Sequence, residues 1–181
     1  MTAHSGHQAA RLATVIESKK TRDGVDLATL SLLSPVLAVF LRHPGCTFCR
    51  ETLSDIARLR RNLESAGIRI VLIHHGVHSA MQSLLAKHGL GDLDLVYDSD
   101  LTLYRAFGLK RGSLSQVFGP KAWVRLFAGL RKHGLGMPGG DPFQMPGVFL
   151  LHRCEVVGSF RHRSIADRPD YRQIADEFTV D

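Results

Sequence analysis

The chain has 181 residues, of which 44% are hydrophobic and 22% are charged, and its formal net charge is +6. This composition is typical of a globular protein with a packed core, and it argues against disorder. No apolar run reaches the roughly 20 residues that span a bilayer, so the sequence predicts no membrane span. Basic residues are mixed with acidic ones and no nucleic-acid-binding module is evident, so nucleic acid is not an expected partner.

The first 20 residues are expected to form a separate N-terminal segment, partly disordered or a short helix. Ala9–Lys20 has helical periodicity, with Leu12, Val15 and Ile16 on one side. The polar start of the chain lacks the apolar stretch of a secretory signal. Three cysteines are too few for a disulfide-stapled secreted scaffold. We therefore expect a cytoplasmic protein.

Residues 21–181 are expected to form a single domain that opens with alternating strands and helices. A turn at residues 21–24 precedes a brief extended piece over Val25–Leu27. The expected strands are Val36–Leu41, Ile68–Ile73 and Leu93–Tyr97, and the expected helices are Thr47–Ala66, His78–His88 and a short one ending at Phe107. This order predicts a largely parallel sheet with helices on both faces.

The C-terminal third interrupts this alternation. Residues 109–141 are expected to be an insertion that contains an amphipathic basic helix over Ala122–Lys132, packed on the core. A hairpin pattern follows, with strands over Gly147–Leu151 and Val156–Phe160, and a final helix is expected over Ile165–Phe178. The basic helix has a second interpretation as a cap over a site or a contact with a membrane surface.

Two cysteines mark the most informative point of the chain. Cys46 and Cys49 lie between the apolar run Val36–Leu41 and the helix that follows it. A helix N-terminus presents unpaired N–H groups and the positive end of a dipole, which stabilise a thiolate. The thiolate is the reactive form of cysteine, and a second thiol can displace it from a mixed disulfide. The spacing therefore predicts thiol–disulfide chemistry.

The position of each cysteine indicates its role. Cys46 is nearest to the helix start, whereas Cys49 is one turn inside and is expected to be shielded. We interpret Cys46 as the nucleophile and Cys49 as the resolving thiol. Arg42 and His43 are expected to add positive charge around both, and Thr47 completes the local site.

Three segments resemble a known family. The segment from Phe40 to Glu51, with its His-Pro-Gly-Cys-Thr-Phe-Cys core, is similar to the signature of the peroxiredoxin-like branch of the AhpC/TSA antioxidant family. That branch includes proteins similar to selenoprotein U and to prostamide/prostaglandin F synthase. The segment Gln144–Phe149 resembles the second motif of the branch, and Asp98–Gly108 resembles its third helix.

The resemblance implies a thioredoxin-like α/β fold. Such a fold has a five-stranded mixed sheet flanked by helices, here with a helical insertion before the cis-proline loop. Met145 and Pro146 would form that loop, with Pro146 facing the two cysteines and exposing backbone to an extended substrate. The implied activity is reduction of a peroxide or a protein disulfide without a cofactor. A thioredoxin- or glutaredoxin-type electron donor would restore the dithiol.

The sequence departs from the peroxiredoxin pattern P-x-x-x-T-x-x-C. When the pattern is aligned on Cys49, Cys46 takes the threonine position and Arg42 takes the proline position. The resemblance therefore leaves the attacking cysteine open. Peroxiredoxins also hold the peroxide oxygen with an arginine. Arg42, Arg161 and Arg163 are the candidates, although Gly158 occupies the aligned position.

Two other functions remain open. The first is reduction of an organic endoperoxide. The second is a non-enzymatic zinc-binding or basic interaction module, with zinc held by Cys46, Cys49, Cys154 and a histidine such as His152. Adjacent histidines on a strand point to opposite faces, so His74 and His75 are interpreted as loop residues rather than as paired metal ligands. The sequence does not indicate the oxidant, the redox potential or the oligomeric state.

Overall fold

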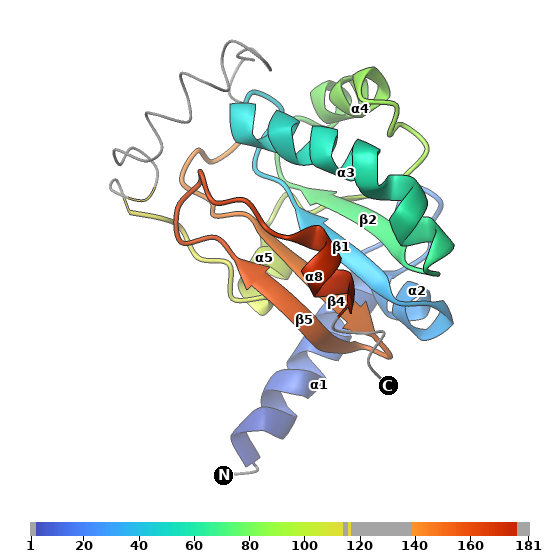
Figure 1. The fold of residues 1–181 in the computed structure, drawn as a ribbon. Helices are drawn as coiled ribbons and strands as arrows, with labels where there is room; N and C mark the ends of the chain where they lie inside the picture. The colour runs from blue at the N-terminus through green and yellow to red at the C-terminus, as the bar shows by residue number, and fades with distance from the viewer. Residues whose placement is uncertain (1–2, 114–115, 117–138, 177–181) are drawn as a thin grey trace.

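The computed structural model describes residues 3–113, 116 and 139–176, and a mixed five-stranded sheet runs through them (Figure 1). The strands are β1 (Val36–Phe40), β2 (Arg69–His74), β3 (Asp94–Tyr97), β4 (Gly147–His152) and β5 (Glu155–Arg161). Their order in the sheet is β3-β2-β1-β4-β5. β1, β2 and β3 are mutually parallel, whereas β4 runs antiparallel to β1 and to β5. The predicted five-stranded mixed sheet with a C-terminal hairpin is confirmed, and the structure places β4 of this hairpin beside β1.

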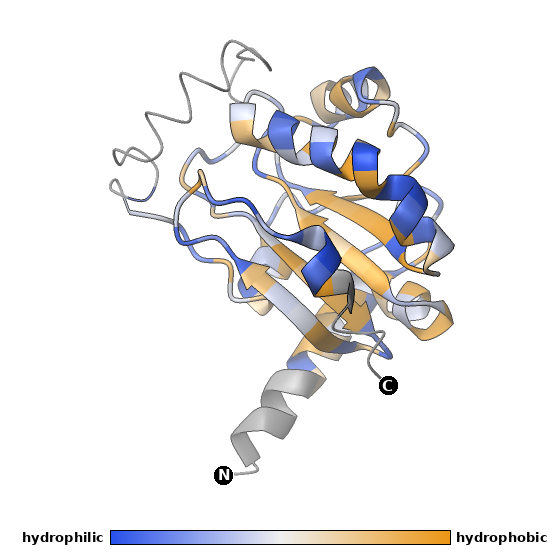
Figure 2. Ribbon diagram, in the orientation of Figure 1, coloured by the Kyte–Doolittle hydropathy of each residue, from blue (hydrophilic) through white to orange (hydrophobic). Residues whose placement is uncertain are grey.

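Helices cover both faces of this sheet. They are α1 (Ala3–Ser18), α2 (Leu27–Leu33), α3 (Thr47–Ser65), α4 (His78–Lys87), α5 (Thr102–Ala106) and α8 (Tyr171–Asp176). One apolar cluster joins the sheet to α3, α4 and α8, and a second joins its other face to α1, α2 and α5. Figure 2 shows β1 and β2 as mainly hydrophobic and α3 as alternately hydrophobic and hydrophilic. None of the helices in the described ranges is both long and apolar enough to cross a membrane.

The central strand explains why the sheet is covered twice. Every residue of β1 is buried. Its side chains alternate between faces, so that Leu37 and Val39 join the cluster under α3 while Val36, Ala38 and Phe40 join the other. A strand that is apolar at every position needs helices on both sides, as the sequence pattern predicts.

The segment after the first turn differs from the expectation. Two isolated bridges, between Lys20 and Asp26 and between Thr21 and Val96, replace the expected extended piece, and Leu27 begins α2 instead of ending that piece. The Asp26 carboxylate accepts a hydrogen bond from the Thr29 backbone N–H at 2.7 Å. This N-cap satisfies a backbone donor that the first turn of a helix leaves unpaired.

The last helix is shorter than predicted at its N-terminal end. Instead of Ile165, α8 begins at Tyr171, since Pro169 and the residue before it disfavour helical backbone. The Asp170 carboxylate accepts from the N–H groups of Arg172 and Gln173 at 3.0 and 3.1 Å, which caps α8 at its new start. The basic helix predicted over Ala122–Lys132 lies outside the described residues.

Candidate active site

The chain turns sharply between β1 and α3, and this turn carries both cysteines. The Cys46 backbone N–H donates to the His43 carbonyl at 3.0 Å, and Cys46 is the N-cap residue of α3 with extended backbone. The Arg50 N–H in turn donates to the Cys46 carbonyl at 3.2 Å. The two cysteines therefore lie in the first turn of α3, at the strand-to-helix edge that the sequence indicates.

Both thiols are buried, and this corrects one expectation. Cys46 is 6% exposed and Cys49 is 3% exposed, so Cys46 is hardly more accessible than its partner. Both are free thiols. They pack among the side chains of the cluster under α3, with Met145 in the same cluster. Arg42 contacts Cys46 and is also bonded to Gln144 of the loop before β4, so the exposure of Cys46 is not set by its place in the helix alone.

Arg42 contacts both sulfur atoms. Its guanidinium Nη1 donates to Cys46 Sγ at 3.3 Å, and its backbone N–H donates to Cys49 Sγ at 3.2 Å. The remaining guanidinium nitrogens donate to the carbonyls of Gln144 and Pro142. Arg42 is only 4% exposed. A cation at this distance favours the charged form of a thiol.

The two thiols differ in acidity. A hydrogen bond from the Cys49 thiol, the charge of Arg42 and the first backbone N–H groups of α3 lower the pKa of Cys46, against the opposing effect of burial. The hydrogen bond to Cys46, together with burial, raises the pKa of Cys49. The two opposite shifts make Cys46 the more acidic thiol of this coupled pair and Cys49 the thiol that holds its proton more firmly.

His43 does not carry the positive charge that the sequence suggests. Burial, the charge of Arg42 and His75 lower the pKa of His43 to about 4. Its imidazole is therefore neutral near pH 7, and Arg42 supplies the positive charge beside the sulfurs. Thr47 is buried as the first residue of α3.

Met145 and Pro146 lie beside the thiols, as expected, within a segment over residues 142–146 that we call the proline loop. Met145 belongs to the same apolar cluster as the cysteines, and Pro146 lines a hollow with Cys49. The described backbone contains no cis peptide bond, which corrects the expectation of a cis-proline at Pro146. The trans form is the more stable isomer at most X–Pro bonds, by about 0.5–1 kcal/mol.

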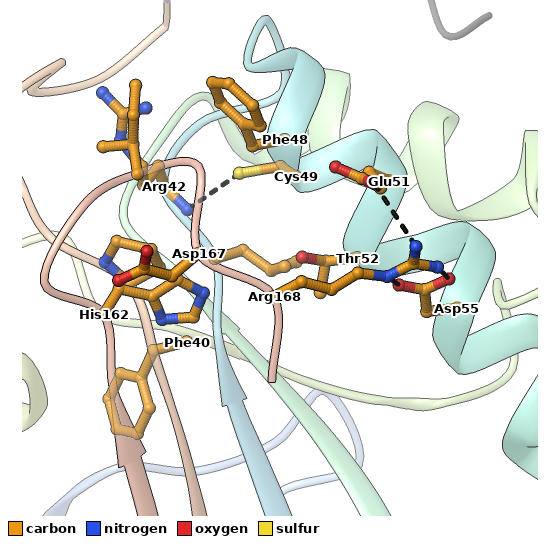
Figure 3. A pocket seen from close by; sticks show the side chains of 13 residues that line it. Phe40, Arg42, Phe48, Cys49, Glu51, Thr52, Asp55, His162, Asp167 and Arg168 are labelled. Carbon is orange, nitrogen blue, oxygen red and sulfur yellow. Dashed lines mark hydrogen bonds and ion pairs between the residues drawn. The ribbon is translucent and has the colours of Figure 1, made fainter. Parts of the chain in front are cut away.

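A small hollow opens beside Cys49 (Figure 3). It lies between the end of β1, the first turns of α3, the proline loop and the segment over residues 162–168. Residues that line it include Phe48, Cys49, Pro146, His162, Ile165 and Arg168. Its lining also includes Arg42, Glu51, Asp55 and Asp167, so apolar and charged side chains both face it, which suits a small molecule with a polar reactive group.

An ion-pair network holds the rim of this hollow. Asp55 of α3 is buried, and it accepts from Arg168 through both carboxylate oxygens and also from Arg58. Arg168 also lies 3.8 Å from the Glu51 carboxylate. Sequence reasoning missed this pair and the hollow, because the partners are 113 residues apart. The sequence signal that could have revealed this pair was Asp55 itself, an acidic residue at a position of the helix whose side chain is buried.

Arg161 is not brought to the thiols. Its Nε donates to the Phe107 carbonyl at 3.2 Å, and its guanidinium lies 4.8 Å from the centre of the Phe149 ring. Phe107 and Phe149 belong to the cluster on the opposite face of the sheet from Cys46 and Cys49. Successive side chains of a strand alternate in direction, so the geometry gives Arg161 no role beside the sulfurs.

The candidate zinc ligands are not brought together either. Cys154 follows β4 at the hairpin, where Leu151 pairs with Val36 at the start of β1, whereas Cys46 follows the other end of that strand. Cys154 packs against α2, with its N–H donating to Ser31 Oγ at 3.0 Å. His74 stacks on His78 and Tyr97, while His75 meets the edge of Tyr104, so the adjacent histidines diverge as expected. The interpretation of both as loop residues is wrong for His74, which is the buried last residue of β2.

Comparisons with known proteins agree with one another on the family. The family model described as AhpC/TSA antioxidant enzyme matches residues 55–164. Human peroxiredoxin-like 2C is 24% identical to this chain, and the alignment covers 76% of this chain and 64% of the relative's length. Zebrafish (Danio rerio) prostamide/prostaglandin F synthase is 26% identical over 90% of this chain and 83% of its own.

A solved structure supports the fold. Peroxidoxin BcpB from Mycobacterium tuberculosis superposes with a TM-score of 0.62, at 17% identity, over 90% of this chain and 92% of that one. This likeness confirms the thioredoxin-type architecture of a mixed five-stranded sheet with flanking helices.

Proposed function

The chain belongs to the AhpC/TSA antioxidant enzyme family, and from that premise we propose that Cys46 and Cys49 are the redox pair of a thiol-dependent peroxidase. Cys46 is the nucleophile and Cys49 is the resolving thiol. The observation that carries this assignment is the contact between the Arg42 guanidinium and Cys46 Sγ at 3.3 Å. It helps to give Cys46 the lower pKa of the two and leaves the proton on Cys49.

The proposed reaction has two steps. The Cys46 thiolate attacks the terminal oxygen of a hydroperoxide, the O–O bond breaks, and the departing alkoxide takes a proton to leave as an alcohol. Cys46 becomes a sulfenic acid. Cys49 then attacks the Cys46 sulfur, its thiol proton and the sulfenic hydroxyl leave as water, and a disulfide forms. A thioredoxin-type dithiol restores both thiols and is itself oxidised to a disulfide.

Each residue near the pair has a distinct part in this proposal. Arg42 stabilises the thiolate, and the N–H groups of the first turn of α3 add to its effect. The hollow that reaches Cys49 opens one helical turn from Cys46, and it is the route by which a small peroxide would approach the pair. Met145 and Pro146 form the side of the site that faces the electron donor.

The test is mass spectrometry of the protein titrated with hydrogen peroxide. The unaltered protein should lose two thiols and gain one Cys46–Cys49 disulfide. Cys49→Ser should accumulate a sulfenic acid at Cys46 that dimedone traps, and Cys46→Ser should lose most of its peroxide consumption. Cys154→Ser is the matched control, because that thiol lies at the far end of the sheet, and it should behave as the unaltered protein. Peroxide turnover by Cys46→Ser at the unaltered rate, or dimedone capture only at Cys49, contradicts the assignment.

A second candidate substrate is an organic endoperoxide. The zebrafish relative is named prostamide/prostaglandin F synthase and aligns with 90% of this chain. Turnover with hydrogen peroxide, a lipid hydroperoxide, a cyclic endoperoxide and a protein disulfide, measured side by side, separates the substrate classes.

A further inference from the structure

Basic side chains border the proline loop. The Met145 N–H donates to the Lys110 carbonyl at 3.2 Å, and Arg111 forms an isolated antiparallel bridge with Gln144. Segments paired in this way lie roughly 5 Å apart. Lys110 and Arg111 are both exposed. Their charges therefore face solvent within about one strand spacing of the loop.

Two further arginines at the end of β5 extend this basic surface. The Arg161 Nε donates to the Phe107 carbonyl at 3.2 Å, at the end of the helix that leads to Lys110. The Gln116 side chain donates to the Arg163 carbonyl at 3.0 Å, which joins the segment after Lys110 to the segment after β5. Both arginines are exposed. We call these four residues the basic rim: Lys110, Arg111, Arg161 and Arg163.

The basic rim keeps an excess of positive charge. Asp141 pairs with Arg111, with 2.8 Å between the carboxylate and Nε. Asp167 accepts from the backbone N–H groups of Arg163 and Ser164. Among the described residues, no other carboxylate forms a hydrogen bond or an ion pair with the rim. The four cations therefore stand against two carboxylates, and the net charge of the whole chain, +6, has the same sign.

The position of the basic rim indicates what covers it. In the proposed function, the proline loop faces the electron donor. A protein that docks there covers roughly 800 Å² of this surface, a patch roughly 30 Å across. Lys110 and Arg111 lie about one strand spacing from the loop, so a docked donor also covers them. Like charges that face each other disfavour a complex, whereas opposite charges speed its formation.

We propose that the basic rim is the docking surface for the electron donor, and that this donor is a dithiol protein with acidic side chains around its reactive cysteines. This inference rests on the proposed function, because it needs a Cys46–Cys49 disulfide. A donor thiolate attacks one sulfur of that disulfide and the other leaves as a thiolate. The second donor thiol then displaces the first, so the donor becomes a disulfide and the protein a dithiol.

Three synthetic dithiol peptides test this surface. They share a Cys-Gly-Pro-Cys core, which is flanked by glutamates, by glutamines or by lysines. Each peptide reduces the peroxide-treated protein, and its rate is divided by its rate with the small neutral hydroxyethyl disulfide, which corrects for differences in thiol pKa. At low salt the glutamate peptide should be at least about fivefold faster than the glutamine peptide, with the lysine peptide slowest. At about 1 M salt, which screens the charges, the three should agree within about twofold.

Charge-reversed variants locate the effect. The double variant Lys110→Glu and Arg163→Glu should lose the preference for the glutamate peptide and should react faster with the lysine peptide. Arg163 does not line the hollow beside Cys49. The matched control reverses two exposed charges elsewhere, Arg11→Glu on α1 and Arg61→Glu on α3, and should keep the preference. Uncharged dithiothreitol should reduce all three proteins at the same rate, because a neutral reagent is not steered by charge.

The outcomes separate this inference from the proposed function. If peroxide forms no Cys46–Cys49 disulfide that dithiothreitol reduces, the proposed function fails. If dithiothreitol reduces the disulfide but the three peptides agree within about twofold at low salt, the proposed function stands and the docking surface is wrong.

Two further results would overturn the docking surface. The first is a full preference for the glutamate peptide in the Lys110→Glu and Arg163→Glu variant, because an acidic partner would then be recognised elsewhere. The second is binding of an oligonucleotide that this variant loses, with no difference among the peptides, because the basic rim would then be a nucleic-acid surface.

Discussion

The acidity of Cys46 results from a small set of contacts that oppose its burial. The Cys49 thiol makes the largest contribution, followed by the Arg42 guanidinium and by backbone N–H groups of the first helical turn. Burial acts in the other direction, because a charged sulfur loses its hydration. The resolving cysteine is therefore also part of the activation of the nucleophile, and its substitution affects more than the second step of the reaction.

Two substitutions of Cys49 test whether its hydrogen bond lowers the pKa of Cys46. Cys49→Ala removes the donor, so the pKa of Cys46 should rise and the thiolate fraction at pH 7 should fall. Cys49→Ser keeps an O–H donor, so its effect should be smaller. The measurement is the pH dependence of Cys46 alkylation by iodoacetamide, with Cys154→Ser in both proteins so that a single thiol reacts. Identical profiles for the serine and alanine variants contradict the assigned hydrogen bond.

At the level of elements, three loops converge at the edge of the sheet where β1 and β2 end. Gly76, two residues after the end of β2, lies against the turn that leads to Cys46 and against the segment that precedes the proline loop. A Cβ atom on Gly76 would lie 2.5 Å from the Gly139 carbonyl oxygen and 2.9 Å from Pro44 Cδ. The Val77 N–H also donates to the same Gly139 carbonyl at 2.8 Å. The site thus depends on a close backbone approach between segments that are distant in sequence.

Gly76→Ala should therefore disturb both stability and activity. The added methyl group meets backbone rather than a flexible side chain, so we expect a loss of about 1–3 kcal/mol in the free energy of unfolding. Peroxide reduction should slow, because Pro44 and residue 139 must both move. Gly91→Ala is the matched control, since its nearest contact is an ordinary 3.5 Å from Ala86 Cα. Urea unfolding of both variants gives the comparison, and equal stabilities would show that the backbone at Gly76 has room for a side chain.

For the whole molecule, buried histidines make stability depend on pH. Burial and neighbouring charge lower the pKa values of His43 and His74 to about 4, and burial also lowers that of His75. The unfolded chain takes up protons at these groups near pH 6.5 while the folded protein does not. The stability contributed by the neutral histidines is thus complete above about pH 6.5 and is lost as the pH falls toward 4.

The expected loss is large enough to measure. For His74, the difference between the unfolded and folded pKa values corresponds to about 2 kcal/mol at pH 5. Urea unfolding at pH 7 and pH 5 should show the unaltered protein losing at least this much. His74→Gln should lose less between the two pH values, whatever its stability at pH 7. A free energy of unfolding that is the same at both pH values contradicts the neutral, buried state of these histidines.

Local sequence pattern was sufficient to predict the order of strands and helices from β1 to α5, the C-terminal hairpin and the position of both cysteines at the start of α3. The apolar run of β1 and the helical periodicity behind Cys46 lie within a few residues of one another, so neighbouring side chains alone carry the signal. The same reasoning failed where local pattern was weak or overridden, as at α2 and at the residues before α8.

The chemistry of the site, in contrast, emerges only from long-range packing. The folded chain buries Cys46, keeps His43 neutral, turns Arg161 to the opposite face and joins Arg42 to Gln144. Burial, charge state and hydrogen-bond partners depend on segments that meet only after folding, and here the partners of Arg42 lie about a hundred residues away. A segment's sequence specifies which side chains it offers, whereas tertiary contacts set the dielectric environment and the neighbours that determine their reactivity.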